Sequence, residues 1–300
     1  MIIDSHLHLL KTKYYNLDLF RENQMYLPQD TSLDFLVAVL KKLNISKVVV
    51  MGQKMERIWD SQCGEDYVLE SSQEHQDLFL PFVSIEPVDR IGKLNRKELD
   101  RLGELPTDRV RGILITPPYG QFRSNDPQVY PFYEIAQDRG WIVQFHHSAN
   151  TGEKLVFAHH KYVSLNFLND VLIDFPKLRV VIEHLGYPWT EELFTLMASS
   201  DNLYADLALL YGQPTLTAWK VVMAKEYGVI HRIMYGSDYY SYDSNAFETM
   251  SEHIDYVRSG INRICEKSGW PLLTEKEING VLSKNACTLY DLDENGKSKE

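Results

Sequence analysis

Two histidines, His6 and His8, stand two residues apart at the end of a short apolar run that begins at Met1. Side chains alternate between the two faces of a β-strand, so these imidazoles project to the same side. Neutral imidazole is a common zinc ligand, and two rings on one side can bind one ion. The pair therefore indicates part of a metal site or, without further ligands, an exposed polar strand end.

Eight apolar, β-branched runs recur along the chain and predict eight strands. They are MIID from Met1, KVVVMG from Lys47, LPFVSIEP from Leu80, RVRGILIT from Arg109, WIVQFHH from Trp141, LRVVIEH from Leu178, NLYADLA from Asn202 and RIMYGSD from Arg232. Several runs are apolar throughout rather than alternating, which is typical of parallel strands covered on both faces.

Helical patterns separate these runs. The residues at helical spacing after Thr31 are Leu33, Leu36, Val37, Leu40 and Leu43. Asp34 lies three residues after Thr31, as in a capping box, and Thr274 with Glu277 forms a second such pair. Further helices are predicted by PFYEIAQDRG, LNDVLIDF, EELFTLM, TLTAWKVVMAKEYG and TEKEINGVLSKNA.

This alternation predicts an α/β fold, a single-domain (β/α)8 TIM barrel over residues 1–290. We expect the polar tail, residues 291–300, to fray. The alternative is a doubly wound open sheet, but no Gly-x-Gly-x-x-Gly follows the first run.

Ionisable residues collect at the ends of the predicted strands, where a barrel of this type places its active site. His6 and His8 end the first run, His146 and His147 the fifth, His184 the sixth and Asp238 the eighth. Adjacent strand residues point to opposite faces, so only one of His146 and His147 can enter the barrel, and spacing does not decide which. The same reasoning excludes Glu183 from the lumen, and we expect it to pair with helix residues.

The segments IDSHLH, WIVQFHHS, VVIEHLGYPW and MYGSD resemble, in this order and near these separations, the amidohydrolase superfamily. The similarity is to its amidohydrolase-related branch, which includes proteins like aminocarboxymuconate-semialdehyde decarboxylase. GEDYVLESSQEHQDLFLPFVSIEP and KNACTLY resemble the same branch, so the resemblance extends from Ile3 to about Tyr290. It implies a metal-dependent enzyme with the TIM-barrel fold.

The resemblance also implies a ligand set for one divalent metal ion: His6, His8, His146 and Asp238. It favours His146 over His147, and it implies that His184 faces the substrate as a polarising or acid/base group. Two-metal members of the superfamily bridge their ions with a carboxylated lysine at the end of the fourth strand, where this chain reads RGILITPP. We therefore expect a single ion. Imidazole and carboxylate ligands suit zinc first, with manganese or iron as alternatives.

These residues predict a metal-dependent hydrolase of a small molecule such as a lactone, amide or ester. Asp238 would accept the proton of an activated water, and His184 would stabilise the oxyanion or protonate the leaving group. The same branch contains metal-dependent lyases, so a nonoxidative decarboxylase or hydratase of a small carboxylated acid, often derived from an aromatic compound, is the alternative. A non-enzymatic binding scaffold is a third hypothesis. The complete ligand set argues against it, because a scaffold would not require an open metal position.

Several loop residues that follow the strands could line a pocket, although ordinary loop packing explains each of them taken singly. They are Lys54, Arg57, Tyr119, Phe122, Arg123, Trp189, Tyr211, Tyr239 and Tyr240.

Composition limits the partners that we expect. The 300 residues carry 31 Lys and Arg against 42 Asp and Glu, a formal charge of −11, which argues against binding to nucleic acid or an anionic membrane. No apolar stretch approaches the roughly 20 residues of a membrane span, and no signal-peptide pattern opens the chain. Cys63, Cys265 and Cys287 are too widely spaced for a disulfide framework. We expect a cytoplasmic enzyme with reduced thiols and a small-molecule substrate, and a homodimer is compatible with apolar outer helices.

Overall fold

The computed structural model describes residues 1–58, 60–147 and 159–298. The strands are β1 (Ile2–His8), β2 (Ile45–Met51), β3 (Gln53–Met55), β4 (Ser61–Cys63), β5 (Phe79–Ile85), β6 (Gly112–Ile115), β7 (Ile142–Phe145), β8 (Arg179–Ile182), β9 (Leu203–Asp206), β10 (Ile233–Met234) and β11 (Tyr239–Tyr240). The helices are α1 (Leu17–Glu22), α2 (Leu33–Lys42), α3 (Asp66–Glu74), α4 (Arg96–Glu104), α5 (Pro117–Gly120), α6 (Tyr130–Asp138), α7 (Leu165–Asp174), α8 (Thr190–Ser199), α9 (Pro214–Glu226), α10 (Ala246–Asp255), α11 (Ile261–Ser268), α12 (Glu275–Asn279) and α13 (Asn285–Leu289). Each of the eight predicted strands is present.

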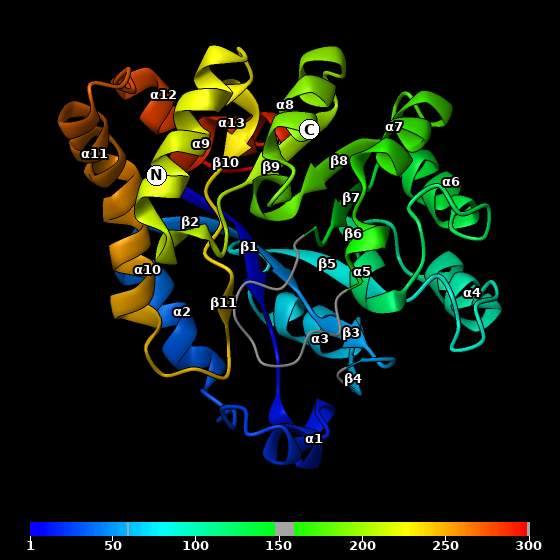
Figure 1. Ribbon diagram of the computed structural model, residues 1–300. Coiled ribbons are helices and arrows are strands. Elements are labelled where there is room, and N and C mark those ends of the chain that lie inside the picture. Colours follow the sequence, from blue (N-terminus) through cyan, green and yellow to red (C-terminus); the bar gives the residue numbers. More distant parts are fainter. Residues whose placement is uncertain (59, 148–158, 299–300) are drawn as a thin grey trace.

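The main sheet closes into a barrel through a single segment of the chain. Its order is β10-β9-β8-β7-β6-β5-β2-β1-β11, and its neighbouring strands are parallel. Because β10 and β11 are two pieces of residues 233–240, this segment pairs with β9 on one side and with β1 on the other. The amide of Ser5 also donates to the carbonyl of Tyr235 at 2.9 Å. The predicted eighth strand is thus the closing strand of the (β/α)8 barrel, and the helices lie outside it (Figure 1).

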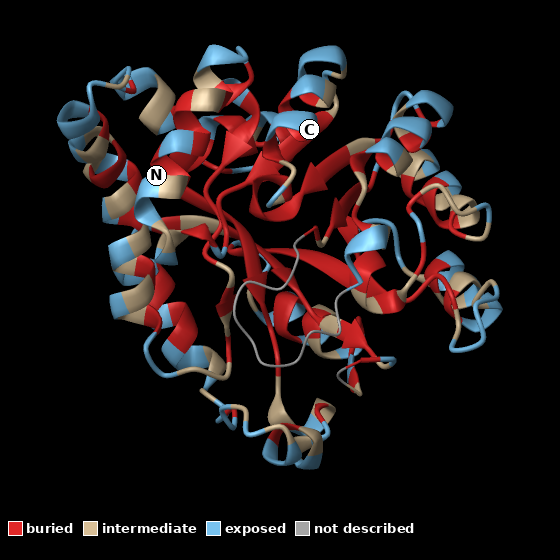
Figure 2. Ribbon diagram, viewed as in Figure 1, coloured by how far each residue is buried: buried red, intermediate tan, exposed pale blue. Residues whose placement is uncertain are grey.

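The strands are buried along most of their length, whereas the surrounding helices expose their outer faces (Figure 2). Side chains such as Ile3, Phe82 and Leu114 fill the barrel lumen. Leu292 joins this cluster, is 2% exposed and lies in a bridge with Ser298. The expectation of a frayed tail is therefore wrong for the start of that segment, because an apolar side chain there closes the base of the lumen.

Local signals explain where the helices begin. Thr274 and Glu277 form the predicted capping box at the start of α12. Helix α2 is also confirmed, but its N-cap is Ser32, whose side chain accepts from the Phe35 amide, rather than Thr31. After β2, the chain forms the short hairpin β3–β4 before α3, and none of the eight apolar runs predicts this hairpin. Three-residue strands are too short to leave a periodic pattern.

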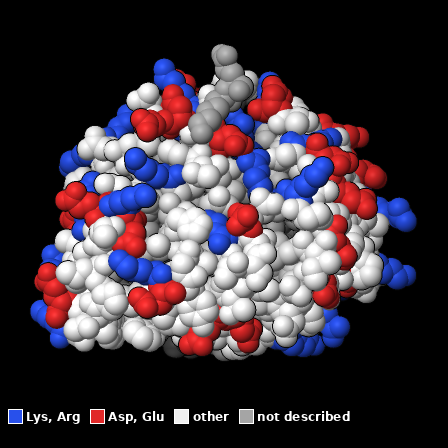
Figure 3. All heavy atoms as spheres, turned by 90° about the horizontal axis from the view of Figure 1, so that it is seen from above, with Lys and Arg blue, Asp and Glu red and all other residues white. Residues whose placement is uncertain are grey.

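No helix in the described ranges combines the length and the apolar character that crossing a bilayer requires. Seen from above, over the ends of α8 and α9, basic and acidic side chains are interspersed (Figure 3). Neither positive nor negative charge therefore dominates that face.

Replacing Gly112 by alanine should destabilise the barrel. An added Cβ at the start of β6 would lie 2.4 Å from the carbonyl oxygen of Ile142 and 2.5 Å from the Phe82 ring, and backbone cannot move aside at low cost. We expect a loss of about 1–3 kcal/mol in the free energy of unfolding, measured in urea. The matched control is Gly103→Ala in α4, where the new Cβ meets open space and helix propensity should add about 0.5–1 kcal/mol. Equal unfolding midpoints for the two variants would contradict this packing.

Candidate metal centre

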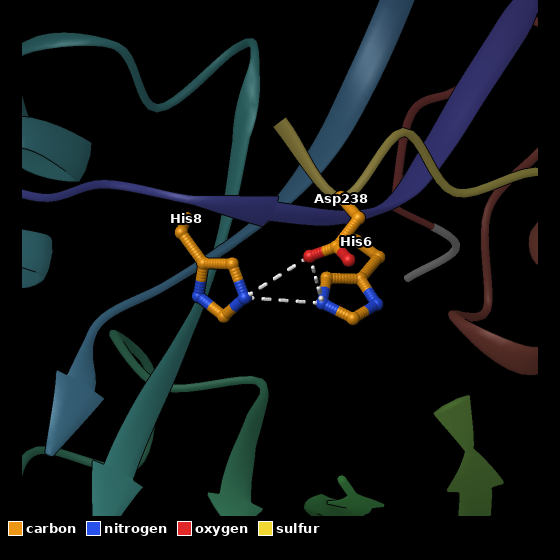
Figure 4. Close-up of side chains that lie close together, drawn as sticks. All are labelled: His6, His8 and Asp238. Atoms are coloured by element: carbon orange, nitrogen blue, oxygen red, sulfur yellow. Dashed lines mark hydrogen bonds and ion pairs between the residues drawn. The ribbon is translucent and has the colours of Figure 1, made fainter. Parts of the chain in front are cut away.

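Three side chains from β1 and from the turn between β10 and β11 converge at the mouth of the barrel (Figure 4). Nε2 of His6 lies 3.2 Å from Nε2 of His8. Oδ1 of Asp238 lies 3.3 Å from the first nitrogen and 3.4 Å from the second. A tetrahedral ion with ligand bonds of about 2.0–2.1 Å has neighbouring ligand atoms about 3.3–3.4 Å apart. The spacing therefore fits three ligands of one divalent cation.

The neighbours of both imidazoles direct their lone pairs toward this point. Nδ1 of His6 lies 3.0 Å from Oδ2 of Asp206, and Nδ1 of His8 lies 3.2 Å from the carbonyl oxygen of Gly52. A neutral ring that donates from Nδ1 keeps its lone pair on Nε2. We assign the tautomers from these acceptors, and the arrangement is the one by which metal-binding histidines are usually oriented.

Asp206, at the end of β9, is a site residue that our sequence reasoning missed. Besides contacting His6, its carboxylate accepts from the amides of His184 at 2.9 Å and Ala208 at 3.1 Å. The side chain is fully buried. The available signal was an acidic residue near the end of the seventh apolar run, NLYADLA. Asp206 thus links His6 to the backbone turn that carries His184.

Glu183 also lies in the site, which corrects the expectation that it pairs with helix residues. Strand β8 ends at Ile182, and the backbone then enters the left-handed region at His184 (φ 58°) and Leu185 (φ 49°). The alternation of a regular strand no longer applies, so Glu183 and His184 both contact site residues. The carboxylate oxygens of Glu183 lie 3.6 Å from Nε2 of His6 and 2.8 Å from Nδ1 of His146.

The two histidines that follow β7 occupy different surroundings. His146 contacts Glu183, stacks on Tyr119 at 4.7 Å and meets the ring of His184 at 5.1 Å. His147 is buried and packs edge-on against Trp189 at 6.0 Å. His146 therefore lies in the site. Its ligation of the ion at His6 and His8 stays a prediction, because its short contact is to Glu183.

Further groups of three candidate ligand atoms adjoin the first. Within 4.8 Å of one another lie the atoms of His6, His184 and Asp206, and those of His146, Glu183 and His184. Glu183 already accepts from Nε2 of Gln144 at 3.0 Å as well as contacting His146. Glu183 and Asp206 thus each hold Nδ1 of a histidine, whereas the ligand atoms of His6, His8 and Asp238 face one another, which makes this group the best candidate centre among the described residues.

The buried carboxylates of the site are held ionised. Burial raises the pKa of Glu183, but His6, His146 and His184 outweigh it and hold that pKa well below its usual range. Burial also raises the pKa of Asp238, but the neighbouring histidines, His6 above all, lower it to about 2. Burial opposes a charge on His6, yet its carboxylate neighbours raise the pKa of His6 well above its usual value. Without a metal ion, the centre therefore holds a proton on His6.

His184 is a proton acceptor in its resting state. Its Nδ1 lies 3.0 Å from the carbonyl oxygen of Ala208, to which it donates, and its Nε2 lies 3.5 Å from a carboxylate oxygen of Glu183. The ring is 1% exposed, and burial lowers its pKa despite the nearby carboxylates. A neutral ring with this tautomer presents the lone pair of Nε2 to the site.

Aromatic rings form the nearest walls. Tyr240 lies parallel to the His8 ring at 5.1 Å, and Tyr242 stacks on Tyr240 at 5.6 Å. Two of the cationic residues considered for the pocket have other partners: Lys54 forms a buried ion pair with Glu98 at 2.5 Å, and Arg57 donates to the carbonyl oxygen of Gly120. The mouth of the site is thus lined by tyrosine, and Lys54 belongs to a separate ion-pair cluster.

Metal binding should weaken as the pH falls. A cation at the centre must displace the proton that His6 holds in the metal-free protein, and the pKa of His6 lies well above its usual value of 6.5. Competition therefore begins above pH 6.5, while Asp238, with a pKa of about 2, stays charged. We expect the zinc dissociation constant to rise about tenfold per pH unit below that onset, measured by competition with a chelator. A flat profile between pH 6 and pH 8 would contradict the placement of His6 as a ligand.

Comparison with known proteins gives one family and a set of similar folds. The sequence model described as Amidohydrolase matches residues 3–292. A search of curated proteins gives no match.

Among solved structures, an uncharacterised TIM-barrel protein from Bordetella bronchiseptica is 19% identical, with 96% of this chain and 97% of that one covered and a TM-score of 0.71. A probable 2-pyrone-4,6-dicarboxylic acid hydrolase from Acinetobacter baumannii is 16% identical, with 97% and 99% covered and a TM-score of 0.66. A 5-carboxyvanillate decarboxylase from Sphingomonas paucimobilis is 13% identical, with 97% and 99% covered and a TM-score of 0.64. At these identities the structural matches establish the TIM-barrel fold alone.

Proposed function

The chain belongs to the amidohydrolase family, and we propose that it is a metal-dependent hydrolase of a small molecule such as a lactone, amide or ester. The observation that carries the proposal is the convergence of His6, His8 and Asp238, whose ligand atoms lie 3.2, 3.3 and 3.4 Å apart. We propose His146 as the fourth ligand. Zinc is the proposed ion, with manganese or iron as alternatives, because the donors are nitrogen and oxygen atoms without sulfur.

A divalent cation held by these residues would polarise a substrate carbonyl and lower the pKa of a water molecule. A side chain of the protein must then take up the proton of that water. Asp238 is ionised at neutral pH and is placed at the ligand set, so its carboxylate can accept the proton. A carboxyl group with a pKa of about 2 holds a proton only briefly, and the proton must pass to a stronger base.

His184 is the proposed recipient of that proton. It lies close enough to Asp238 for each to affect the pKa of the other, and its Nε2 carries a lone pair. After protonation, the imidazolium can donate the proton to the leaving group, and Glu183 at 3.5 Å stabilises the positive charge meanwhile. The carbonyl of Ala208 and the carboxylate of Asp206 fix the ring and its backbone during both transfers.

The resting state of His184 favours hydrolysis over the alternative lyase reaction. A decarboxylase must protonate carbon after CO2 leaves, which requires a side chain that already carries a proton to donate. Burial lowers the pKa of His184, so at neutral pH this ring begins as a base. Hydrolysis uses a base first and an acid second, in the order that a neutral histidine can supply.

A nonoxidative decarboxylase or hydratase of a carboxylated, aromatic-derived acid remains the second candidate. The observation in its favour is the pair of rings parallel to site histidines, Tyr240 on His8 (10° between planes) and Tyr119 on His146 (27°). Flat walls of this kind suit a planar substrate ring. The solved decarboxylase that shares this fold is consistent with such a substrate class.

A substrate panel separates the two reactions. Zinc-loaded protein is incubated with lactones, simple esters and amides, and with carboxylated phenols, while acid release and CO2 release are followed together. The proposal expects acid release without CO2 from at least one lactone, ester or amide, and its loss in Asp238→Asn. Release of CO2 from a carboxylated phenol, without hydrolysis of the other compounds, would replace the hydrolase by the lyase.

A further inference from the structure

We propose that the face of the barrel opposite the metal centre binds a small multivalent oxyanion, in a pocket of about 670 Å³. The metal centre lies at the carboxyl ends of the strands. This pocket lies at the amino ends of β2, β5 and β6, which are neighbours in the sheet (Figure 1). The inference concerns binding at this face and does not depend on the proposed function.

Four cationic side chains line the pocket, on a chain whose formal charge is −11: Lys47, Arg109, Arg111 and Lys297. Asp77 and Asp108 line it as well. Within the described ranges, none of the four cations lies within 4.0 Å of a carboxylate oxygen, whereas cations such as Lys54 and Arg101 are paired with glutamates. Unpaired positive charge gathered around a cavity favours an anionic ligand.

The sheet brings two of these cations together although they are far apart in the sequence. Val48 pairs with Phe79, and Phe82 pairs with Gly112, so Lys47 and Arg111 lie at the starts of the strands on either side of β5. Two strand spacings separate these strands by roughly 9–10 Å. Burial lowers the pKa of Lys47, the nearby Arg111 lowers it further, and Asp77 acts in the opposite direction. Both side chains line the same pocket, and each is close enough for the charge of Arg111 to act on Lys47.

A buried hydroxyl at the pocket supports the same ligand class. Ser72 of α3 lines the pocket and is 5% exposed, and its Oγ has no hydrogen-bond partner among the residues that the structure describes. A buried hydroxyl is normally satisfied, because leaving it unpaired is unfavourable. The guanidinium of Arg111 donates to Oγ of Ser298 at 3.0 Å and keeps further donors. Guanidinium, ammonium and hydroxyl donors around one cavity match phosphate or clustered carboxylate oxygens.

Calorimetric titration of the metal-loaded protein with inorganic phosphate tests the proposal. At low ionic strength we expect one equivalent to bind with a dissociation constant below about 1 mM, and hydrogen exchange to slow in residues 45–48 and 109–112. Arg111→Gln and Arg109→Gln should each weaken binding about tenfold, since each removes charge-assisted hydrogen bonds. The matched control is Arg258→Gln, an exposed arginine outside the pocket, which should change the affinity less than twofold.

Three results would overturn the proposal. They are the absence of binding up to about 10 mM phosphate, an affinity that neither pocket variant changes, and a loss of binding in Asp238→Asn equal to that in Arg111→Gln. The last result would place the anion at the metal centre. Because the readout is phosphate binding and not turnover, failure of the hydrolase assignment would leave the outcome of this test unaffected.

Discussion

Asp238→Asn should lower kcat/KM by at least about a hundredfold on any substrate that the wild-type protein turns over. The amide cannot accept the proton of the attacking water, and its neutral oxygen is a weaker metal ligand than the carboxylate that lies 3.3 and 3.4 Å from the two imidazole nitrogens. The backbone should tolerate the change. Asp238 has a φ of 53°, and asparagine is one of the few residues that adopts this region readily.

The control for this variant is Asp243→Asn, five residues further along the same segment. The carboxylate of Asp243 accepts from the amide of Asn245 and is absent from the three ligand groups of the described residues. We expect activity within a few-fold of wild type. Steady-state kinetics with matched zinc loading and matched unfolding midpoints measure both variants. Activity of Asp238→Asn within tenfold of wild type would remove Asp238 from its role as ligand and base.

Asp206→Asn should lower the zinc affinity by about 10–100-fold without removing a ligand. The carboxylate oxygen that faces Nδ1 of His6 would become an amide group, which donates rather than accepts. His6 would then accept at Nδ1 and carry its proton on Nε2, where the metal must bind. The other oxygen can still accept from the amides of His184 and Ala208, so the turn after β8 should survive.

If the carboxamide instead presents its oxygen to His6, it loses the two backbone hydrogen bonds, and the turn that carries His184 loosens. The two outcomes are separable, because the first changes the zinc affinity and the second changes kcat at saturating zinc. Asp201→Asn, an exposed residue ahead of β9, serves as the control and should change neither quantity. An unchanged zinc affinity together with an unchanged kcat would show that Asp206 does not orient the site.

Much of the barrel could be predicted from the sequence because parallel strands covered on both faces require uninterrupted apolar runs. The eighth run, residues 232–238, illustrates the limit. It predicts one strand, whereas the structure has the short strand β10 near its start, a turn over the rest of it, and β11 directly after its end. An added Cβ at Gly236 would lie 2.9 Å from Cβ of His6, so only glycine allows this turn to approach β1. That contact joins residues 230 positions apart, and no local pattern reveals it.

The candidate site was predictable where residues end regular strands. His6 and His8, near the carboxyl end of β1, converge with Asp238 at one face of the barrel, although Asp238 lies in the turn between β10 and β11. The alternation rule misplaces Glu183, because the backbone has already left the strand after Ile182. Asp206 was missed because a single acidic residue at a strand end is common, and its meaning lies in its contact with His6.

Metal analysis of the purified protein tests the central claim most directly. After equilibrium dialysis against zinc at pH 8 and removal of free metal, the account predicts one equivalent per chain in wild type. It predicts less than about a tenth of an equivalent in a His6→Ala, His8→Ala double variant that keeps the wild-type circular dichroism spectrum. Two equivalents in wild type, or an equal zinc content in wild type and the double variant, would contradict a single centre at His6, His8 and Asp238.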